Sequence, residues 1–163
     1  MYDNLMNKFK WGNAADPKVY LDENNRRMFS NYRNIFGTLG KELLLKGDTI
    51  KAVEVAHRGL NIVPAEKIPY DYSSIGLAEV LLRSGEKDEG IKILYDTIGY
   101  SFQYLDYIVN IKTEERFGLQ YPTWYNIQAL IDIYNMSLEL KLTALILAIE
   151  PGLNNYYSKL YSK

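Results

Sequence analysis

FGTLGKELLLKGDTIKAVEVAHRGLNIVP, residues 36–64, is the stretch that decides the fold of this chain. Bulky and small residues recur there at helical spacing on both sides of a Lys46-Gly47-Asp48 corner. They are Phe36, Leu39, Gly40, Leu43, Ala52, Ala56 and Gly59. A glycine after a basic last turn can take the left-handed conformation that ends a helix, and Asp48 offers an N-cap to the next one. The stretch therefore predicts two antiparallel helices joined by a tight turn.

This spacing resembles one unit of the tetratricopeptide repeat, a helix-turn-helix module of about 34 residues. A similar corner, Ser84-Gly85-Glu86, returns 38 residues later, again with apolar residues at helical spacing around it. The second copy matches less well, because Ser74 stands where the first copy has Phe36 and nothing replaces Pro64. We therefore predict an irregular tetratricopeptide-like array rather than a regular solenoid.

Working outward from this stretch, we expect an all-α chain that forms a single domain over residues 1–163. Its parts are expected to be about three antiparallel helix pairs, a short N-terminal helix and a C-terminal capping helix. The expected ranges are 1–21 for the N-terminal helix and an irregular lead-in, 22–64, 70–111 and 122–150 for the three pairs, and 153–161 for the capping helix. The Pro151-Gly152 pair is expected to separate the last two, because proline and glycine end helices.

Composition excludes several classes of partner. The 163 residues hold 19 Lys and Arg against 20 Asp and Glu, so no overall field exists to attract nucleic acid, and we expect no nucleic-acid partner. The absence of cysteine excludes disulfides and thiolate chemistry. The longest apolar run, residues 138–149, is interrupted by Glu139 and Lys141 and is too short to span about 30 Å of hydrocarbon. We expect a soluble domain.

The residues that carry enzyme chemistry are sparse in this sequence. His57 is the only histidine and has no neighbour in the sequence that would complete a metal site or a nucleophile. Glu114 and Glu115 are adjacent carboxylates in a polar segment, where nothing apolar is present to raise a pKa. We therefore predict no catalytic, cofactor-binding or metal-binding residue, and a protein that is not an enzyme.

The repeat register points to a binding groove lined by the first helix of each pair. Its expected residues are Asn34, Lys41, Leu45, Tyr72, Glu79, Arg83 and Tyr125. Lys41 and Arg83 would meet carboxylates of a peptide or protein partner, and the tyrosines would supply apolar area. A separate aromatic face, Tyr100, Tyr104 and Tyr107, recurs at i, i+4 and i+7 and suits either helix packing or stacking on a sugar or peptide.

Both ends of the chain leave alternatives open. Near the N-terminus, Tyr2, Leu5, Met6 and Phe9 share a helix face that suits either a packed end-helix or, with Lys8, Lys10 and Trp11 beside it, a segment at a lipid interface. Near the C-terminus, the apolar residues of 138–149 surround their helix instead of forming one stripe. Either residues 154–161 fold back to cover them, or a second copy of the chain does so in a homo-oligomer.

Three segments carry a resemblance to a known family: residues 2–12 (YDNLMNKFKWG), residues 16–22 (DPKVYLD) and residues 25–28 (NRRM). They resemble the C-terminal region of large bacterial multi-spanning membrane proteins, a family of unknown function similar to protein O-mannosyltransferases. The resemblance implies that Met1 begins a fragment, that this tail is extracytoplasmic and tethered to the membrane through its parent chain, and that the transferase's acidic catalytic residues lie elsewhere. It also implies an alternative role, an accessory domain that positions an acceptor protein or saccharide.

Overall fold

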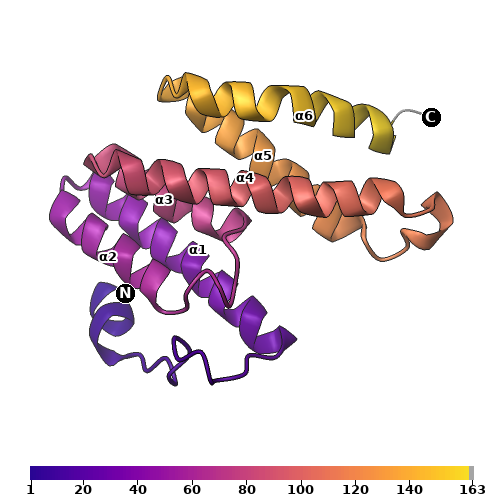
Figure 1. The fold of residues 1–163 in the computed structure, drawn as a ribbon. Helices are drawn as coiled ribbons and strands as arrows, with labels where there is room; N and C mark the ends of the chain where they lie inside the picture. Colours follow the sequence, from indigo (N-terminus) through magenta and orange to yellow (C-terminus); the bar gives the residue numbers. More distant parts are fainter. Residues whose placement is uncertain (162–163) are drawn as a thin grey trace. The chain divides into compact units, whose positions relative to one another are not determined.

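The computed structural model describes residues 1–161, apart from the side chains of Thr113 and Tyr161. These residues form helices and turns without a strand, which confirms the all-α class (Figure 1). The elements are η1 (Asn4–Lys8), α1 (Glu23–Leu45), α2 (Thr49–Asn61), η2 (Tyr72–Ser74), α3 (Ile75–Ser84), α4 (Lys87–Asn110), η3 (Thr113–Glu115), α5 (Gln120–Glu139) and α6 (Thr143–Tyr161). Within residues 1–161, no helix combines the length and the apolar composition that crossing a membrane requires.

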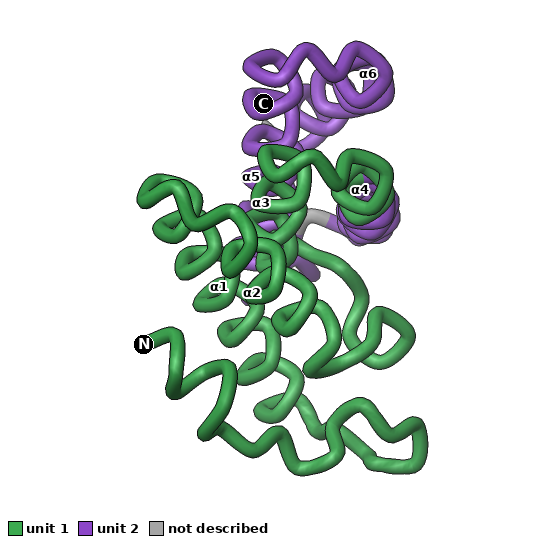
Figure 2. Tube along the Cα trace, turned by 90° about the vertical axis from the view of Figure 1, so that its left-hand side faces the viewer, with its two compact units in different colours: residues 1–94 green, residues 95–163 purple. Residues whose placement is uncertain are grey.

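Two compact units make up the chain, unit 1 with residues 1–94 and unit 2 with residues 95–163 (Figure 2). Helix α4 begins in unit 1 and continues into unit 2. In unit 1, α1 packs on both α2 and α3, and α2 also packs on α3. In unit 2, α5 packs on α6.

The first helix pair forms through the capping residues that its sequence supplies. The Asp22 side chain accepts a hydrogen bond from the Asn25 backbone N–H at 2.8 Å and so begins α1. Gly47 has a φ of 78° in the left-handed region, and Asp48 accepts from the Lys51 backbone N–H at the start of α2. Gly85, with a φ of 98°, forms the same kind of corner after α3. Both corners predicted from the sequence are therefore present.

Glycines let the helices of unit 1 approach closely. A Cβ placed on Gly37 would lie 3.1 Å from the backbone carbonyl carbon of Gly76, so α1 and α3 cross with their backbones in near contact. A Cβ on Gly59 would lie 2.7 Å from the Cβ of Phe36, which is fully buried between the helices. These small residues are needed for packing, because any side chain there would push two helices apart.

A buried arginine fastens the long connection between the first two helix pairs. Arg33 of α1 is fully buried, and its guanidinium donates hydrogen bonds to the backbone carbonyls of Val63, Ile68 and Pro69 at 2.9 to 3.0 Å. Burial lowers the pKa of Arg33 from its ordinary value, an effect opposed by the nearby Asp71. The connection from α2 to η2 therefore receives from one side chain the hydrogen bonds that a regular element would supply internally.

The N-terminal helix is shorter than its apolar stripe suggested. The element η1 is one π-helical turn that ends where the backbone N–H of Phe9 donates to Asn4 O at 2.9 Å. Leu5 is its buried residue, and the Tyr2 hydroxyl donates to Glu54 of α2 at 2.8 Å. The segment is thus packed against unit 1, as the end-helix alternative requires.

The expected capping helix at 153–161 does not exist as a separate element. Helix α6 runs from Thr143 to Tyr161 with Pro151 inside it, so residues 154–161 continue the helix instead of folding back. The prediction was wrong because one buried stripe, Leu145, Ile149 and Tyr156, extends past the proline and holds the helix together. A Cβ on Gly152 would lie 2.6 Å from the Phe102 ring, so this glycine serves close packing rather than helix termination.

The third helix pair is also displaced from its expected bounds. Helix α5 begins at Gln120, two residues before Pro122, and it reaches Glu139, so Leu138 belongs to α5 rather than to the partner helix. The turn between α5 and α6 contains Lys141 with a φ of 57°. No glycine marks this corner, so the rule that a glycine follows a helix could not predict it.

Candidate functional site

Five of the predicted groove residues lie on two exposed helix stripes of unit 1. Asn34, Lys41 and Leu45 lie on one face of α1, and Glu79 and Arg83 lie on one face of α3. Two ion pairs join the stripes: Lys41 Nζ lies 3.4 Å from Glu79 Oε2, and Arg83 Nε lies 2.8 Å from Glu79 Oε1. We call this surface, defined by these five residues, the α1–α3 face.

The α1–α3 face is open to solvent and carries more positive than negative charge. The side chains of Lys41 and Arg83 are 46% and 35% exposed, whereas that of Glu79 is 20% exposed. Leu45, at the end of α1, is 82% exposed. The face thus offers two cations that share one carboxylate, with a large apolar side chain beside them.

The remaining two groove residues stand apart from these stripes in the chain. Tyr72 begins η2, just before α3, and is half-buried. Tyr125 belongs to α5 in unit 2, where its ring lies 6.0 Å from that of Tyr121. Of the seven residues that the repeat register selected, the structure joins three, Lys41, Glu79 and Arg83, through ion pairs.

A second candidate surface was not found by the groove prediction. The lead-in segment and the start of α1 enclose a cleft of about 550 Å³, which we call the aromatic cleft. Its aromatic and apolar lining consists of Phe9, Trp11, Val19, Tyr20, Leu21, Met28, Phe29 and Tyr32. Its volume lies within the range of ligand-binding clefts, and its lining is mainly aromatic and apolar.

Cations border the aromatic cleft. Lys8, Lys10 and Asn25 are its polar lining residues, and no carboxylate lines it. Lys8 is paired with Asp3 at 2.6 Å, whereas Lys10 makes no ion pair or hydrogen bond with any residue that the structure describes. The sequence contained these lysines and Trp11, but it could not show that the chain from Phe9 to Leu21 returns to α1 and encloses a hollow.

The three tyrosines of the predicted aromatic face lie on α4 within unit 2. Tyr100 and Tyr107 are 37% and 61% exposed, and Tyr104 between them is partly buried. Burial raises the pKa of Tyr104, and the neighbouring hydroxyls of Tyr100 and Tyr107 raise it further. Two of the three rings are thus accessible to a ligand.

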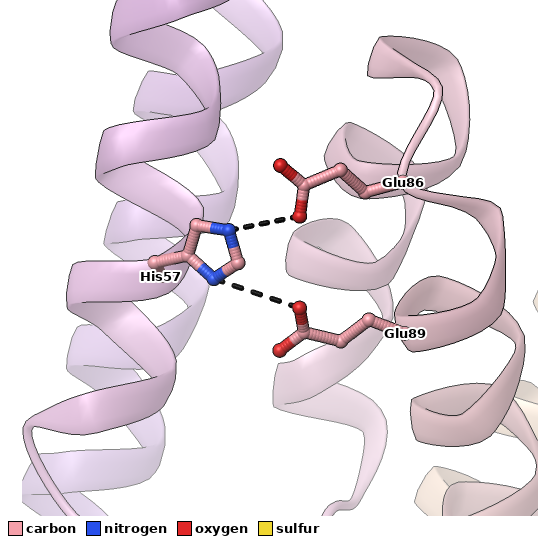
Figure 3. Close-up of side chains that lie close together, drawn as sticks. All are labelled: His57, Glu86 and Glu89. Atoms are coloured by element: carbon pink, nitrogen blue, oxygen red, sulfur yellow. Dashed lines mark hydrogen bonds and ion pairs between the residues drawn. The ribbon is translucent and has the colours of Figure 1, made fainter.

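His57 has partners that the sequence did not reveal. Its Nε2 lies 2.9 Å from Oε2 of Glu86, and its Nδ1 lies 3.7 Å from Oε2 of Glu89, as Figure 3 shows. When the imidazole is protonated, both of its nitrogens can donate to a carboxylate, whereas the neutral ring can donate only one N–H. The cluster joins α2 to the start of α4.

The same cluster contains one potential metal ligand atom from each residue, and these atoms lie within 4.8 Å of one another. The three side chains are 36%, 40% and 45% exposed, so water competes for them. The positive end of the α4 dipole favours the two carboxylates and opposes an added cation. We interpret the cluster as a polar contact between helices, in which the His57 ring is hydrogen-bonded to Glu86.

Comparisons with known proteins return no match. No protein-family model, no curated protein and no solved structure matches this chain. Its function must therefore be inferred from the chemistry of its own residues.

Proposed function

We propose that the chain is a non-catalytic interaction module that binds a peptide or protein partner across the α1–α3 face. One observation carries the proposal: the stripes of α1 and α3 lie side by side, because Gly37 and Gly76 allow the two helices to cross in near contact. Lys41 and Arg83 come together through this crossing and meet on the same carboxylate, Glu79.

The ion pairs of this face can be replaced by ion pairs with the carboxylates of a partner. Exposed ion pairs contribute only about 0 to 1 kcal/mol, so releasing Lys41 or Arg83 from Glu79 costs little. A partner carboxylate can then accept from the Arg83 guanidinium in a charge-assisted hydrogen bond. Leu45 supplies apolar area at the end of the same stripe, so a partner with an acidic residue near an apolar one fits this surface.

The wider setting is part of the same proposal. The resemblance of residues 2–28 to membrane glycosyltransferase-like proteins supports an extracytoplasmic tail that is tethered through a parent chain. The alternative is an accessory domain that positions an acceptor protein or saccharide for glycan transfer. The exposure of Tyr100 and Tyr107 favours this alternative, because tyrosine rings stack on sugar faces.

Selection from a displayed random peptide library, followed by fluorescence anisotropy with the selected peptides, tests the interaction. The Lys41→Glu/Arg83→Glu double variant should bind the selected peptides at least about tenfold more weakly than the wild type, because two attractions become repulsions. A matched control is Lys92→Glu/Lys112→Glu, which changes the net charge equally at exposed lysines outside the face.

Circular dichroism should show that both double variants remain helical. Equal loss of binding in both variants would indicate a response to net charge alone and would contradict the assignment of this face. Unchanged binding in the Lys41→Glu/Arg83→Glu variant would contradict it as well. Binding of an oligosaccharide panel that Tyr107→Ala removes would support the saccharide alternative instead.

A further inference from the structure

We propose that the aromatic cleft is a second, separate binding site, and that it takes an acidic peptide segment which inserts one large apolar side chain. This site does not depend on the α1–α3 face, since none of the residues that line the cleft belongs to that face. The inference is built from the packing of the cleft rings, their exposure and the charges around them.

The rings of the cleft are held in place before any ligand arrives. The Trp11 ring lies 4.9 Å from that of Tyr32 in an edge-to-face contact and 5.8 Å from that of the fully buried Phe36. The Phe9 ring lies 5.9 Å from Trp11 and 6.2 Å from Tyr32. Because these contacts link the lead-in to α1, a ligand need not order the rings itself, which lowers the entropy cost of binding.

The mouth of the cleft leaves apolar surface exposed to water. Phe9 is 42% exposed, Met28 is 43% exposed and Tyr20 is 86% exposed. Lone exposed apolar residues need no explanation, but here three of them surround one hollow of about 550 Å³. A bulky side chain that enters the aromatic cleft would contact this exposed apolar surface.

A second cleft, on the other side of the lead-in, is also lined by cations. This cleft, of about 660 Å³, shares Lys10, Trp11, Gly12 and Ala14 with the aromatic cleft, and Arg58 of α2 lies in its wall. Like the aromatic cleft, it is lined by no carboxylate. The Nε atom of Arg58 is buried and has no hydrogen-bond partner among the residues that the structure describes.

The combination of charges and rings decides the chemistry of the occupant. Lys10 lines both clefts: the aromatic cleft contains the rings, and the second cleft contains Arg58. A peptide that inserts an apolar side chain into the aromatic cleft would therefore meet positive charge when it carries carboxylates on either side of that side chain. A cationic ligand, such as a methylated lysine, would be repelled by Lys10 and would find no carboxylate in the lining.

The shape of the site favours a peptide over a lipid surface. An interfacial segment turns the apolar face of a helix, with its aromatic rings, towards the lipid. Here Trp11 packs inward on Phe36 and lines a hollow, so a single inserted side chain matches the geometry better than a flat headgroup layer does.

The experiment uses labelled peptides in which a run of Glu and Asp surrounds one central residue, varied among Phe, Trp, Leu and Ala. Fluorescence anisotropy with the whole chain should show binding of the Phe, Trp and Leu peptides and at least about tenfold weaker binding of the Ala peptide. A basic version, with Lys replacing the acidic residues around Phe, should not bind, and the affinity of the acidic peptides should fall as salt rises.

Two variants test the site itself. Met28→Glu puts a charge into the exposed mouth, and Lys10→Glu reverses the charge between the two hollows; each should weaken binding of the Phe peptide by about tenfold or more. Lys92→Glu is the matched control, since it changes the same charge at an exposed position outside both hollows, and it should leave the affinity unchanged. Circular dichroism should show unchanged helicity in all three variants.

Three results would overturn the inference. The first is that no peptide of the set binds, and the second is that the Phe and Ala peptides bind equally well. The third is that the chain sediments with vesicles of phosphatidylglycerol and phosphatidylcholine, loses this property in Lys10→Glu, and does not bind the peptides. Failure here leaves the α1–α3 face untouched, because that test depends on Lys41 and Arg83 instead.

Discussion

Replacing Arg33 by methionine should destabilise the fold more than any exposed substitution. The guanidinium of Arg33 is fully buried and donates to the backbone carbonyls of Val63, Ile68 and Pro69 at 2.9 to 3.0 Å. Methionine has a similar length and no donor, so it fills much of the space while leaving the three carbonyls without their partner.

The magnitude follows from opposing contributions. Each hydrogen bond to a charged donor contributes about 1.5 to 3 kcal/mol net, so three bonds give roughly 4.5 to 9 kcal/mol. These hydrogen bonds are offset by the cost of keeping the guanidinium out of water, which is several kcal/mol per buried ion. Methionine does not carry this cost. Burial lowers the pKa of Arg33, which is the direction expected when a charged group is kept out of water. We expect a net loss of about 3 kcal/mol, or roughly 10 °C in Tm for a chain of this length.

Urea unfolding followed by circular dichroism at the helical band measures this loss. Arg27→Met is the matched control: Arg27 is on the same helix, its side chain is 72% exposed, and its ion pair with Glu23 is worth no more than about 0.5 kcal/mol. Limited proteolysis should also cut Arg33→Met first between Ile62 and Tyr70. If the free energy of unfolding of Arg33→Met lies within about 1 kcal/mol of that of Arg27→Met, the reasoning is refuted.

Two further predictions test packing and proton binding. Gly37→Ala should destabilise the chain by about 1 to 3 kcal/mol because its Cβ would meet the α3 backbone, whereas Gly99→Ala, in an open part of α4, should stabilise it by about 0.5 to 1 kcal/mol; thermal unfolding of the two variants should shift in opposite directions. Burial and the hydrogen bond to Asp106 raise the pKa of Tyr156 to about 12, so its contribution to stability is present below pH 10 and is lost as the pH rises towards 12. Tyr156→Phe should therefore lose less stability than the wild type between these pH values in urea unfolding, and equal slopes would contradict the assignment.

The parts of the fold that follow from local sequence were predictable. The corners at Gly47 and Gly85 could be predicted because the left-handed residue that ends a helix is usually a glycine. Asp22 and Asp48 predicted the starts of helices, because an aspartate side chain can act as an N-cap. These signals act over a few residues and do not need the rest of the chain.

The parts that depend on packing were not predictable in the same way. Pro151 looked like the end of a helix, but a buried stripe on both sides of it overrides the missing hydrogen bond. No local pattern predicts that Arg33 is buried, because only the three-dimensional path of residues 62–70 brings carbonyls to it.

The candidate sites also differ in whether local sequence could predict them. Lys41, Glu79 and Arg83 could be selected from helical spacing, since residues on one helix face are fixed by the period alone. The aromatic cleft and the His57 cluster join residues that are 20 or more positions apart, such as Phe9 with Tyr32 and His57 with Glu86. No pattern of neighbouring residues in the sequence predicts these contacts.

The near contact of Gly37 with Gly76 has a consequence for how this sequence tolerates change. A methyl group on Gly37 would lie 3.1 Å from the Gly76 carbonyl carbon, so it must move α3 away, whereas a methyl group on Gly76 would lie 3.4 Å from the Gly37 Cα, which is an ordinary contact distance. Gly37→Ala should therefore cost more stability than Gly76→Ala, although the two sites share one crossing and their effects need not add. In genetic terms, the crossing tolerates change on its α3 side and resists it on its α1 side, so a reversion at Gly37 alone would restore most of the stability.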